Sequence, residues 1–281
     1  MAPTAVPSPA WADRLRDLVT KNLKENPALI SYALASYDKS AGGSIQPRVR
    51  YVVHRGLVNE RRKEGDGSSN LIQDNDGKEY LSDKLVITTD ARSPKARQLA
   101  SSPHVELAWW LASTQHQFRI VGSAYILPSP SFSQAPHTTP SSSLASTAAD
   151  IDPSASSFSF PFPAGKLAPY DAFSWEQERV RQFRKLSPEL RASFYRPVPG
   201  TTLEEWGGKM DDLPQELPEG VEEAEGEEQK KQVEQALKNM ALVVIDPTEI
   251  DLCDLGSTPN VRTRWRLDAS SGEWKEEGLV P

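Results

Sequence analysis

The sequence predicts a mainly β protein with flanking helices, arranged as a small Greek-key barrel. The first observation is a set of roughly five or six stretches rich in Val, Ile, Thr and aromatic residues, each with the length of one strand. The second is that segments with helical spacing and good N-capping residues lie before and between these stretches. Small antiparallel sheets of this size commonly close into a barrel with helices outside it.

Composition limits the organisation of the chain and its partners. With 281 residues and 37% hydrophobic content, the chain can bury one substantial core, which predicts a single domain over residues 1–281. The Ser/Pro/Ala-rich stretch 128–165 is expected to be a disordered insertion, and the acidic stretch 207–235 a flexible linker that leads into a short helix. The net charge of −7 and the pI near 5.3 argue against nucleic acid or an anionic membrane as a partner.

The cysteine and histidine content bears on compartment and metal binding. Cys253 is the single cysteine, which excludes an internal disulfide and favours a reducing compartment. No Cys or His pair has the spacing of metal ligands, so no metal site is expected. The N-terminus lacks the basic and apolar regions of a secretory leader, and no apolar run reaches transmembrane length. We therefore expect a cytoplasmic protein.

The chain begins with a predicted helix and two predicted strands. Residues 8–24 place apolar side chains on one face, with Ser8 as the N-cap and Pro9 at the first helical position. Residues 30–37 and 47–56 have strand composition, whereas residues 57–80 are rich in charge, Gly, Asn and Asp and predict an exposed loop.

The second of these strands carries arginines within an alternating pattern. Arg50 and Val52 share one face, and Val53 and Arg55 share the other. A guanidinium inside a strand needs a partner for its charge, and a phosphate held bidentately is one such partner. The alternative is an edge strand whose arginines are solvated.

A buried strand at 84–89 is followed by a turn and a predicted helix over 94–100. Ser93 suits the N-cap and Pro94 the first helical position. The free backbone N–H groups at this helix start, together with Lys95 and Arg97, form a place that favours an anion.

Residues 105–112 and 115–127 predict two antiparallel neighbouring strands joined by a short turn. Trp109 and Trp110 point to opposite faces; the simplest interpretation places both in the core, and the alternative places one of them at a dimer interface or beside a ring. Gln117 and Arg119 share one face, so both can reach the same neighbouring site.

The C-terminal part is predicted to contain two helices and three further strands. Ser174 caps a helix that runs to 186, and a second short helix opens at 187–189. The strands are expected at 239–247, 250–255 and 262–268. Three arginines on one face of the last strand, Arg262, Arg264 and Arg266, need either water or an anionic ligand.

Four motifs occur in a particular order: VRYVVHRG, VITTDARSPKARQLASSPHVELAWW, HQFRIVGSA and NVRTRWRL. This ordered set resembles the pyridoxamine 5'-phosphate oxidase-like flavoproteins, which are FMN-binding split β-barrels, and more closely their Alr4036-type branch. The resemblance covers residues 10–127 well and 170–281 more loosely. It implies a Greek-key split barrel, FMN as the cofactor and a homodimer.

The resemblance also implies which residues bind the cofactor. Arg50 matches the phosphate-binding arginine of the family's R-x-V-x-x-K strand, and Arg55 falls where that motif has its lysine. Ser93 and Lys95 match the serine and second residue of the phosphate loop, where Pro94 departs from the family's arginine and Arg92 is a possible replacement charge. The implied cofactor-binding set is Arg50, Val52, Val53, Arg55, Thr88, Thr89, Ser93, Lys95, Gln117 and Arg264. Within it, Thr88 and Thr89 lie along the flavin, Gln117 reaches the flavin across a dimer interface, and Arg264 is the arginine of the C-terminal strand.

The C-terminal motif departs from that of the true oxidases. Asp254 stands where a tryptophan would fall, and Asn260 and Arg262 replace the R-x-H pair that grips pyridoxal phosphate. FMN binding is therefore supported better than vitamin B6 oxidation. No Ser-His-Asp or Cys-His arrangement supports a hydrolase. The resulting hypothesis is an FMN-dependent oxidoreductase acting on an unknown small molecule, and the alternative is a flavin-binding carrier or regulator without turnover.

Overall fold

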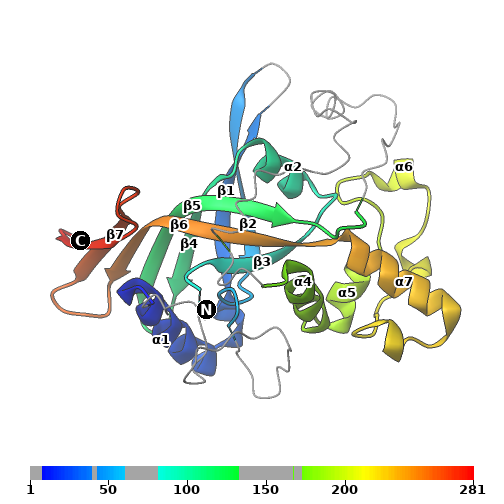
Figure 1. The fold of residues 1–281 in the computed structure, drawn as a ribbon, viewed down its shortest axis with the longest axis horizontal. Coiled ribbons are helices and arrows are strands. Elements are labelled where there is room, and N and C mark those ends of the chain that lie inside the picture. Colours follow the sequence, from blue (N-terminus) through cyan, green and yellow to red (C-terminus); the bar gives the residue numbers. More distant parts are fainter. Residues whose placement is uncertain (1–7, 40–42, 61–81, 133–166, 168–172) are drawn as a thin grey trace.

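The computed structural model describes residues 8–39, 43–60, 82–132, 167 and 173–281 of the chain. It is mainly antiparallel sheet with flanking helices (Figure 1), as the sequence predicts. The strands are β1 Ser31–Lys39, β2 Ile45–Val53, β3 Leu85–Asp90, β4 His104–Leu111, β5 His116–Leu127, β6 Met240–Asp254, β7 Val261–Leu267 and β8 Trp274–Leu279. The helices are α1 Ala10–Glu25, α2 Pro94–Ser101, α4 Trp175–Arg184, α5 Pro188–Ser193, α6 Leu203–Trp206 and α7 Gly226–Asn239, with 3-10 turns at Pro27–Ile30, Met210–Asp212 and Val221–Glu223.

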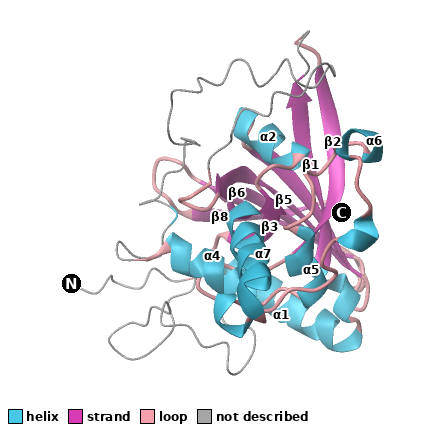
Figure 2. Cartoon of the chain, turned by 90° about the vertical axis from the view of Figure 1, so that its right-hand side faces the viewer, coloured by secondary structure: helices cyan, strands magenta, loops and turns pink. Residues whose placement is uncertain are grey.

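Strand β6 organises the sheet. The strand order is β2-β1-β4-β5-β6-β7-β8, and β3 pairs with β6 beside this path. The first half of β6 lies between β3 and β5, whereas its second half lies between β5 and β7. Figures 1 and 2 show β1 and β2 extending past the rest of the sheet as a long hairpin. The sheet is therefore split around one shared strand, in the manner of a split barrel.

The first half of β6 is buried on both faces. Val243 and Ile245 pack into the main core, whereas Leu242 and Val244 face a second cluster with Phe173. A continuous apolar run is typical of a strand that is covered on both sides. A third apolar cluster brings together Phe183 of α4, Met240 at the start of β6, and side chains of α5 and α7.

Residues 239–247 and 250–255, predicted as two strands, form the single strand β6. Pro247 does not interrupt it, because the pairing register shifts at this point: Val121 pairs with Glu249 and Gly122 with Pro247, so β6 bulges at Thr248. A Cβ atom at Gly122 would lie 2.3 Å from the carbonyl oxygen of Asp246, so only glycine allows this approach. The predicted 262–268 strand is β7, and β8 was not predicted.

The acidic stretch 207–235 is not a flexible linker in the structure. It contains two 3-10 turns and most of α7, whose Val233 and Ala236 are fully buried. A few buried apolar residues at helical spacing are enough to hold an otherwise charged helix against the protein.

Three smaller expectations also need correction. Helix α1 has Pro9 as its N-cap with no side-chain cap, whereas the Ser8 hydroxyl accepts a bond from Arg16. Leu57 and Val58, at the start of the predicted 57–80 loop, are buried. Trp109 is buried, but Trp110 is 44% exposed, so only the first is a core residue of this chain. Residues 61–80 of that loop and 133–165 of the insertion lie outside the described residues, and the single-domain organisation stays a prediction.

Candidate functional site

A cavity of about 570 Å3 lies where strands β2 and β3 meet the segment that follows α5. Its volume is ordinary for a small-molecule or cofactor site. One side is formed by the strands and the start of α2, and the other by residues 190–210. The lining side chains on the strand side are Ser31, Tyr51, Val52, Val53, Arg55, Thr88, Thr89, Asp90 and Lys95. Six of the ten residues proposed for cofactor binding therefore line this one cavity.

The turn from β3 into α2 is built as predicted. The Ser93 hydroxyl caps α2 by accepting a bond from the backbone N–H of Ala96 at 3.3 Å, and Pro94 occupies the first turn. The same hydroxyl lies 3.2 Å from the Thr89 hydroxyl, so Ser93 is joined to the cavity wall. The helix start and its free N–H groups therefore lie at the edge of the cavity.

Lys95 is a cation without a partner at this edge. Burial, and then the neighbouring charge of Arg50, lower its pKa to about 8. Its ammonium group makes no hydrogen bond or ion pair with any residue that the structure describes. A half-buried cation in this state favours an anionic ligand, because the ligand would supply the missing compensation.

Arg50 is held beside Lys95 by neutral groups. Its Nη1 donates to the Ser36 hydroxyl at 2.7 Å, and its Nη2 donates to Gln98 Oε1 at 2.5 Å. Gln98 is in α2, so this bond joins β2 to the helix that carries Lys95. Burial, followed by Arg48, lowers the pKa of Arg50. Within the described part of the chain Arg50 forms no ion pair, so two cations share one corner without a carboxylate bonded to either.

Three further predicted residues complete the strand side. Arg55 donates from Nε to the Thr88 hydroxyl at 3.4 Å, and Thr89 lies next in β3. Val52 and Val53 line the same cavity from β2. This wall therefore presents hydroxyl, guanidinium and aliphatic groups to the cavity.

Arg92 is not the replacement phosphate ligand that the sequence suggested. Its Nε and Nη2 donate to the two carboxylate oxygens of Asp90 at 3.0 and 2.6 Å. Nη2 also donates to the carbonyl oxygens of Phe194 and Arg196, at 3.1 and 2.9 Å. Its donors are therefore used within the protein, where they join the β3–α2 turn to the segment after α5.

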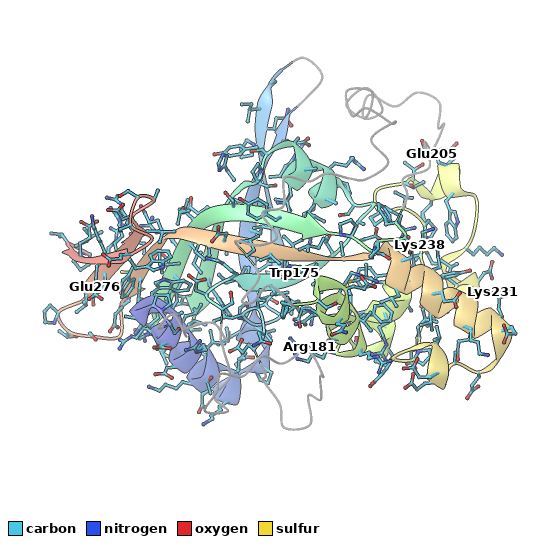
Figure 3. All side chains as sticks on the ribbon, in the orientation of Figure 1. Trp175, Arg181, Glu205, Lys231, Lys238 and Glu276 are labelled. Carbon is cyan, nitrogen blue, oxygen red and sulfur yellow. The ribbon has the colours of Figure 1, made fainter. Side chains whose placement is uncertain are left out.

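Gln117 and Arg264 do not line the cavity of this chain. Cross-strand pairing places them on the sheet face that also carries Tyr51: Gln117 opposes Trp110 and Arg264 opposes Asp251. Figure 3 shows Glu205 of α6 and Glu276 of β8 at opposite ends of the molecule. Because β7 pairs with β8, Arg264 lies toward the end away from α6. Reaching the flavin across a dimer interface stays a prediction for Gln117.

The arginines of β7 are paired with carboxylates, not free for an external anion. Arg264 lies 3.5 Å from Asp251 and 3.6 Å from Glu249. Arg262 donates to Asp251 at 2.8 Å, and Arg266 donates to Glu249 at 2.8 Å. Burial of Asp251 opposes ionisation, but its bonds from Arg262 and Arg119 outweigh that effect and lower the pKa. These three arginines therefore join β7 to β6 through ion pairs.

The positions that depart from the oxidase motif have structural partners. Asp254 accepts bonds from the backbone N–H groups of Gly256 and Ser257 and from the Ser257 hydroxyl. It thereby shapes the turn that follows β6. Asp254 and Arg262 therefore both have partners within the protein.

The opposite wall of the cavity was largely missed from the sequence. Tyr195 packs against the α5–α7 cluster, whereas Arg196 lines the cavity. A capping box between Thr202 and Glu205 starts α6, and this S/T-x-x-E pattern was the available signal. The wall consists of Leu190, Ser193, Phe194, Arg196, Pro197, Val198, Pro199, Gly200, Thr201, Leu203, Trp206 and Met210.

Among the described residues, no helix is long and apolar enough to span a membrane. In the same part of the chain, no group of three or more His, Cys, Asp or Glu side chains could hold a metal ion. A cytoplasmic location stays a prediction.

The part of the chain that contains the strand side of the cavity is similar to a known family. Residues 8–128 match the family described as pyridoxamine 5'-phosphate oxidase, FMN-binding domain. No curated protein sequence matches the chain.

Two solved structures are similar to this one. A pyridoxamine 5'-phosphate oxidase-related, FMN binding protein from Nostoc punctiforme PCC 73102 is 19% identical, with a TM-score of 0.57 over 99% of this chain and 100% of that chain. PhzG from Burkholderia lata 383, in complex with tetrahydrophenazine-1-carboxylic acid, is 14% identical, with a TM-score of 0.47 over 98% and 94% of the two chains. The first likeness shows the split-barrel fold. The match to the FMN-binding domain of pyridoxamine 5'-phosphate oxidase is confined to residues 8–128, which include the strand side of the cavity.

Proposed function

We propose that the protein is an FMN-dependent oxidoreductase that acts on a small molecule, with FMN held in the cavity between β2, β3 and residues 190–210. The observation that carries this proposal is the Lys95 ammonium group, which is half-buried and unpaired beside Arg50 at the cavity edge. A phosphate monoester carries the charge that this corner lacks.

The residues present fit FMN. Arg50, Lys95 and the Ser93 hydroxyl would hold the phosphate, with the free N–H groups at the start of α2. Thr88 and Thr89 would lie along the ring, between the aliphatic side chains of β2 and the opposite wall. When bound, FMN supplies the redox chemistry, and the protein supplies binding, orientation and exclusion of water.

The pairing of Asp90 supports an anion in the same cavity. Asp90 lines the cavity, and a bare carboxylate there would repel a phosphate. Arg92 forms a two-bond pair with this carboxylate and so neutralises it. Because Arg92 neutralises Asp90, the positive charges of Arg50 and Lys95 predominate at this corner of the cavity.

We also propose a homodimer in which a second copy covers the outer sheet face. Along β2, Val49 is 72% and Tyr51 80% exposed, and Trp110 on β4 adds a further exposed ring. Cross-strand pairing places these three side chains on one face with Gln117. An apolar face that is continuous with the cavity favours a self-complementary partner. In such a dimer, Gln117 would be available to the partner's cavity.

The test begins with the absorbance spectrum of the purified protein and analysis of the cofactor released on denaturation. FMN that remains bound through gel filtration, and whose spectrum bleaches anaerobically with NADH or NADPH, supports the oxidoreductase. A yellow protein that neither NAD(P)H nor pyridoxamine phosphate reduces would support the alternative, a flavin carrier or regulator. Protein that does not bind added FMN would refute the cofactor site itself.

A further inference from the structure

We propose that the wall formed by residues 194–210 is a substrate subsite for a flat, apolar molecule that carries one carboxylate group, with Arg196 as the carboxylate ligand and Trp206 as the stacking surface. This inference rests on the proposed function, because it names the class of compound that the oxidoreductase takes.

The wall is apolar and partly open. Leu203 is 68% exposed and Met210 38% exposed, and both line the cavity together with the Trp206 ring. Large apolar side chains exposed together mark a binding surface more often than scattered single residues do. Phe194 and the Pro197–Pro199 stretch continue the same surface. An apolar ligand would cover these side chains.

Arg196 is the polar group in this wall that lacks compensation. Its Nε is buried without a hydrogen bond, and its guanidinium has no partner among the residues that the structure describes. Nearby arginines differ: Arg181 donates to Glu178, and Arg191 donates to the carbonyl of Leu217. Because a partly buried guanidinium with a buried, unbonded Nε is costly, the unpaired Arg196 indicates an acidic ligand. Its planar fork matches a carboxylate bidentately.

The charge of this subsite distinguishes it from the phosphate corner. Arg50 and Lys95, on β2 and α2, provide two cations for a doubly charged phosphate. Arg196 belongs to the segment after α5 and stands among Phe194, Pro197 and Val198. One cation within an apolar wall suits a singly charged head on an apolar body.

The backbone of the wall is fixed before any ligand arrives. Arg92 donates to the carbonyls of Phe194 and Arg196, and Asn239 donates to the Phe194 carbonyl at 2.8 Å. Gly200 has a positive φ of 94°, and a Cβ there would lie 3.5 Å from Pro94 Cγ at the start of α2. A rigid wall reduces the entropy that binding must overcome.

The Trp206 ring is also positioned by its surroundings. It ends α6, whose capping box is complete, and Gly207 then turns the chain in the left-handed region. A Cβ at Gly208 would lie 2.6 Å from Trp206 Cζ2, so the ring lies directly against the backbone of Gly208. Glycine at 208 therefore allows the ring orientation that faces the cavity.

The experiment measures binding of 2-naphthoate to the FMN-loaded protein by calorimetry and by perturbation of the flavin spectrum. Its neutral analogue 2-naphthalenemethanol and its phosphate analogue 2-naphthyl phosphate are titrated in parallel. We expect naphthoate to bind at least tenfold more tightly than either analogue. Arg196→Met should weaken naphthoate at least tenfold and leave the neutral analogue unchanged, because only the charged head is affected.

Three further variants make the result specific. Trp206→Ala should weaken naphthoate and its neutral analogue by the same factor, and Arg196→Lys should restore part of the naphthoate affinity. Arg184→Met is the matched control, because Arg184 pairs with Glu222 on the surface away from the cavity lining. It should leave all affinities unchanged. Thermal unfolding of each variant identifies any loss that comes from misfolding.

The FMN affinity of every variant is measured first, which separates this inference from the proposed function. If the wild type does not bind FMN, the proposed function is wrong, and calorimetry on the FMN-free protein still decides whether Arg196 recognises naphthoate. Equal binding of naphthoate and its neutral analogue would overturn the subsite. So would tighter, Arg196-dependent binding of the phosphate, or loss of FMN instead of naphthoate in Arg196→Met.

Discussion

The Arg92 guanidinium lies against the Asp90 carboxylate, with Nη2 2.6 Å from Oδ2 and Nε 3.0 Å from Oδ1. The same Nη2 donates to two carbonyl oxygens more than a hundred positions further along the chain. One side chain therefore neutralises an acid beside the anion corner and fixes the wall that faces it. Arg92 therefore joins the two sides of the cavity.

Replacing Arg92 alone should destabilise the protein more than replacing Arg92 and Asp90 together. Arg92→Met removes the charge partner of the Asp90 carboxylate and one donor from each of the Phe194 and Arg196 carbonyls, and we expect a loss of about 2–4 kcal/mol in the free energy of unfolding. The double variant Arg92→Met, Asp90→Asn should recover part of this loss, because no charge is then left unpaired. Urea denaturation measures both. Equal stability of the single variant and the wild type would contradict this role of Arg92.

Removing either cation of the phosphate corner should weaken FMN binding. Arg50→Ala and Lys95→Ala should each cost about 1.5–3 kcal/mol of binding free energy, because each removes a charge-assisted bond to the phosphate. Quenching of FMN fluorescence on titration measures the affinity. Arg48→Ala is the matched control, since Arg48 lies on the same strand but pairs with Asp38 in solvent. Unchanged binding in both test variants would remove the phosphate site.

The affinity for FMN should fall as the pH rises above 8. The pKa of Lys95 in the free protein is lowered to about 8, and a bound phosphate would raise it again, so binding above that pH takes up a proton. Below pH 8 the group is already charged and no proton is taken up. The dissociation constant should therefore rise by up to about tenfold per pH unit between about pH 8 and 9.5. In Lys95→Arg, which stays charged, this rise should vanish while tight binding persists.

Gly122→Ala tests the bulge that lets β6 pass through Pro247. The added Cβ would lie 2.3 Å from the Asp246 carbonyl, which requires the backbone of β5 or β6 to move. We expect a loss of about 1–3 kcal/mol in unfolding free energy. Gly278→Ala in β8 is the control, because a Cβ there has no atom within 4 Å. Similar denaturation midpoints for the two variants would show that the strands adapt freely.

A charge on the outer sheet face should weaken the proposed dimer. Val49→Glu places a carboxylate on that face in both copies of a two-fold assembly, so sedimentation should show at least a tenfold weaker association. Val221→Glu, on a 3-10 turn outside that sheet face, should leave association unchanged. A wild type that sediments as a monomer at all concentrations would refute the homodimer.

Much of the fold could be predicted because the sequence carries local signals for it. The alternating strands β4 and β5 and the serine caps at Ser93, Ser174 and Ser187 appear in the structure as expected. The misses are elements without such signals. Strand β8 is short and mostly exposed, so its sequence lacks alternating apolar residues. In α7, the apolar side chains that become buried are few and follow an acidic run. Continuity of β6 through Pro247 depends on a bulge at Thr248, opposite Val121 and Gly122 of β5, and such a register shift leaves no local sequence signal.

The candidate site also contains parts that the sequence could predict and parts that it could not. The grouping of Lys95 with Thr88 and Thr89 follows from a strand, a turn and a helix that are adjacent in sequence. The true role of Arg92 depends on carbonyls at positions 194 and 196, and the place of Arg196 depends on that bond in turn. No local sequence pattern indicates contacts between residues that lie more than a hundred positions apart in the chain. Arg264 was assigned by motif, and its carboxylate partners on β6 could be identified only after strand pairing was known.

The two sides of the cavity come from parts of the chain that are far apart in sequence, residues 51–95 and 190–210. With FMN and substrate bound as proposed, selection could act on the two sides separately, because replacements at positions 197–210 would change which compounds enter without changing the residues that hold FMN. Chimeras that exchange only this later stretch between homologues, with Arg92 kept, should transfer substrate preference from one flavoprotein to another.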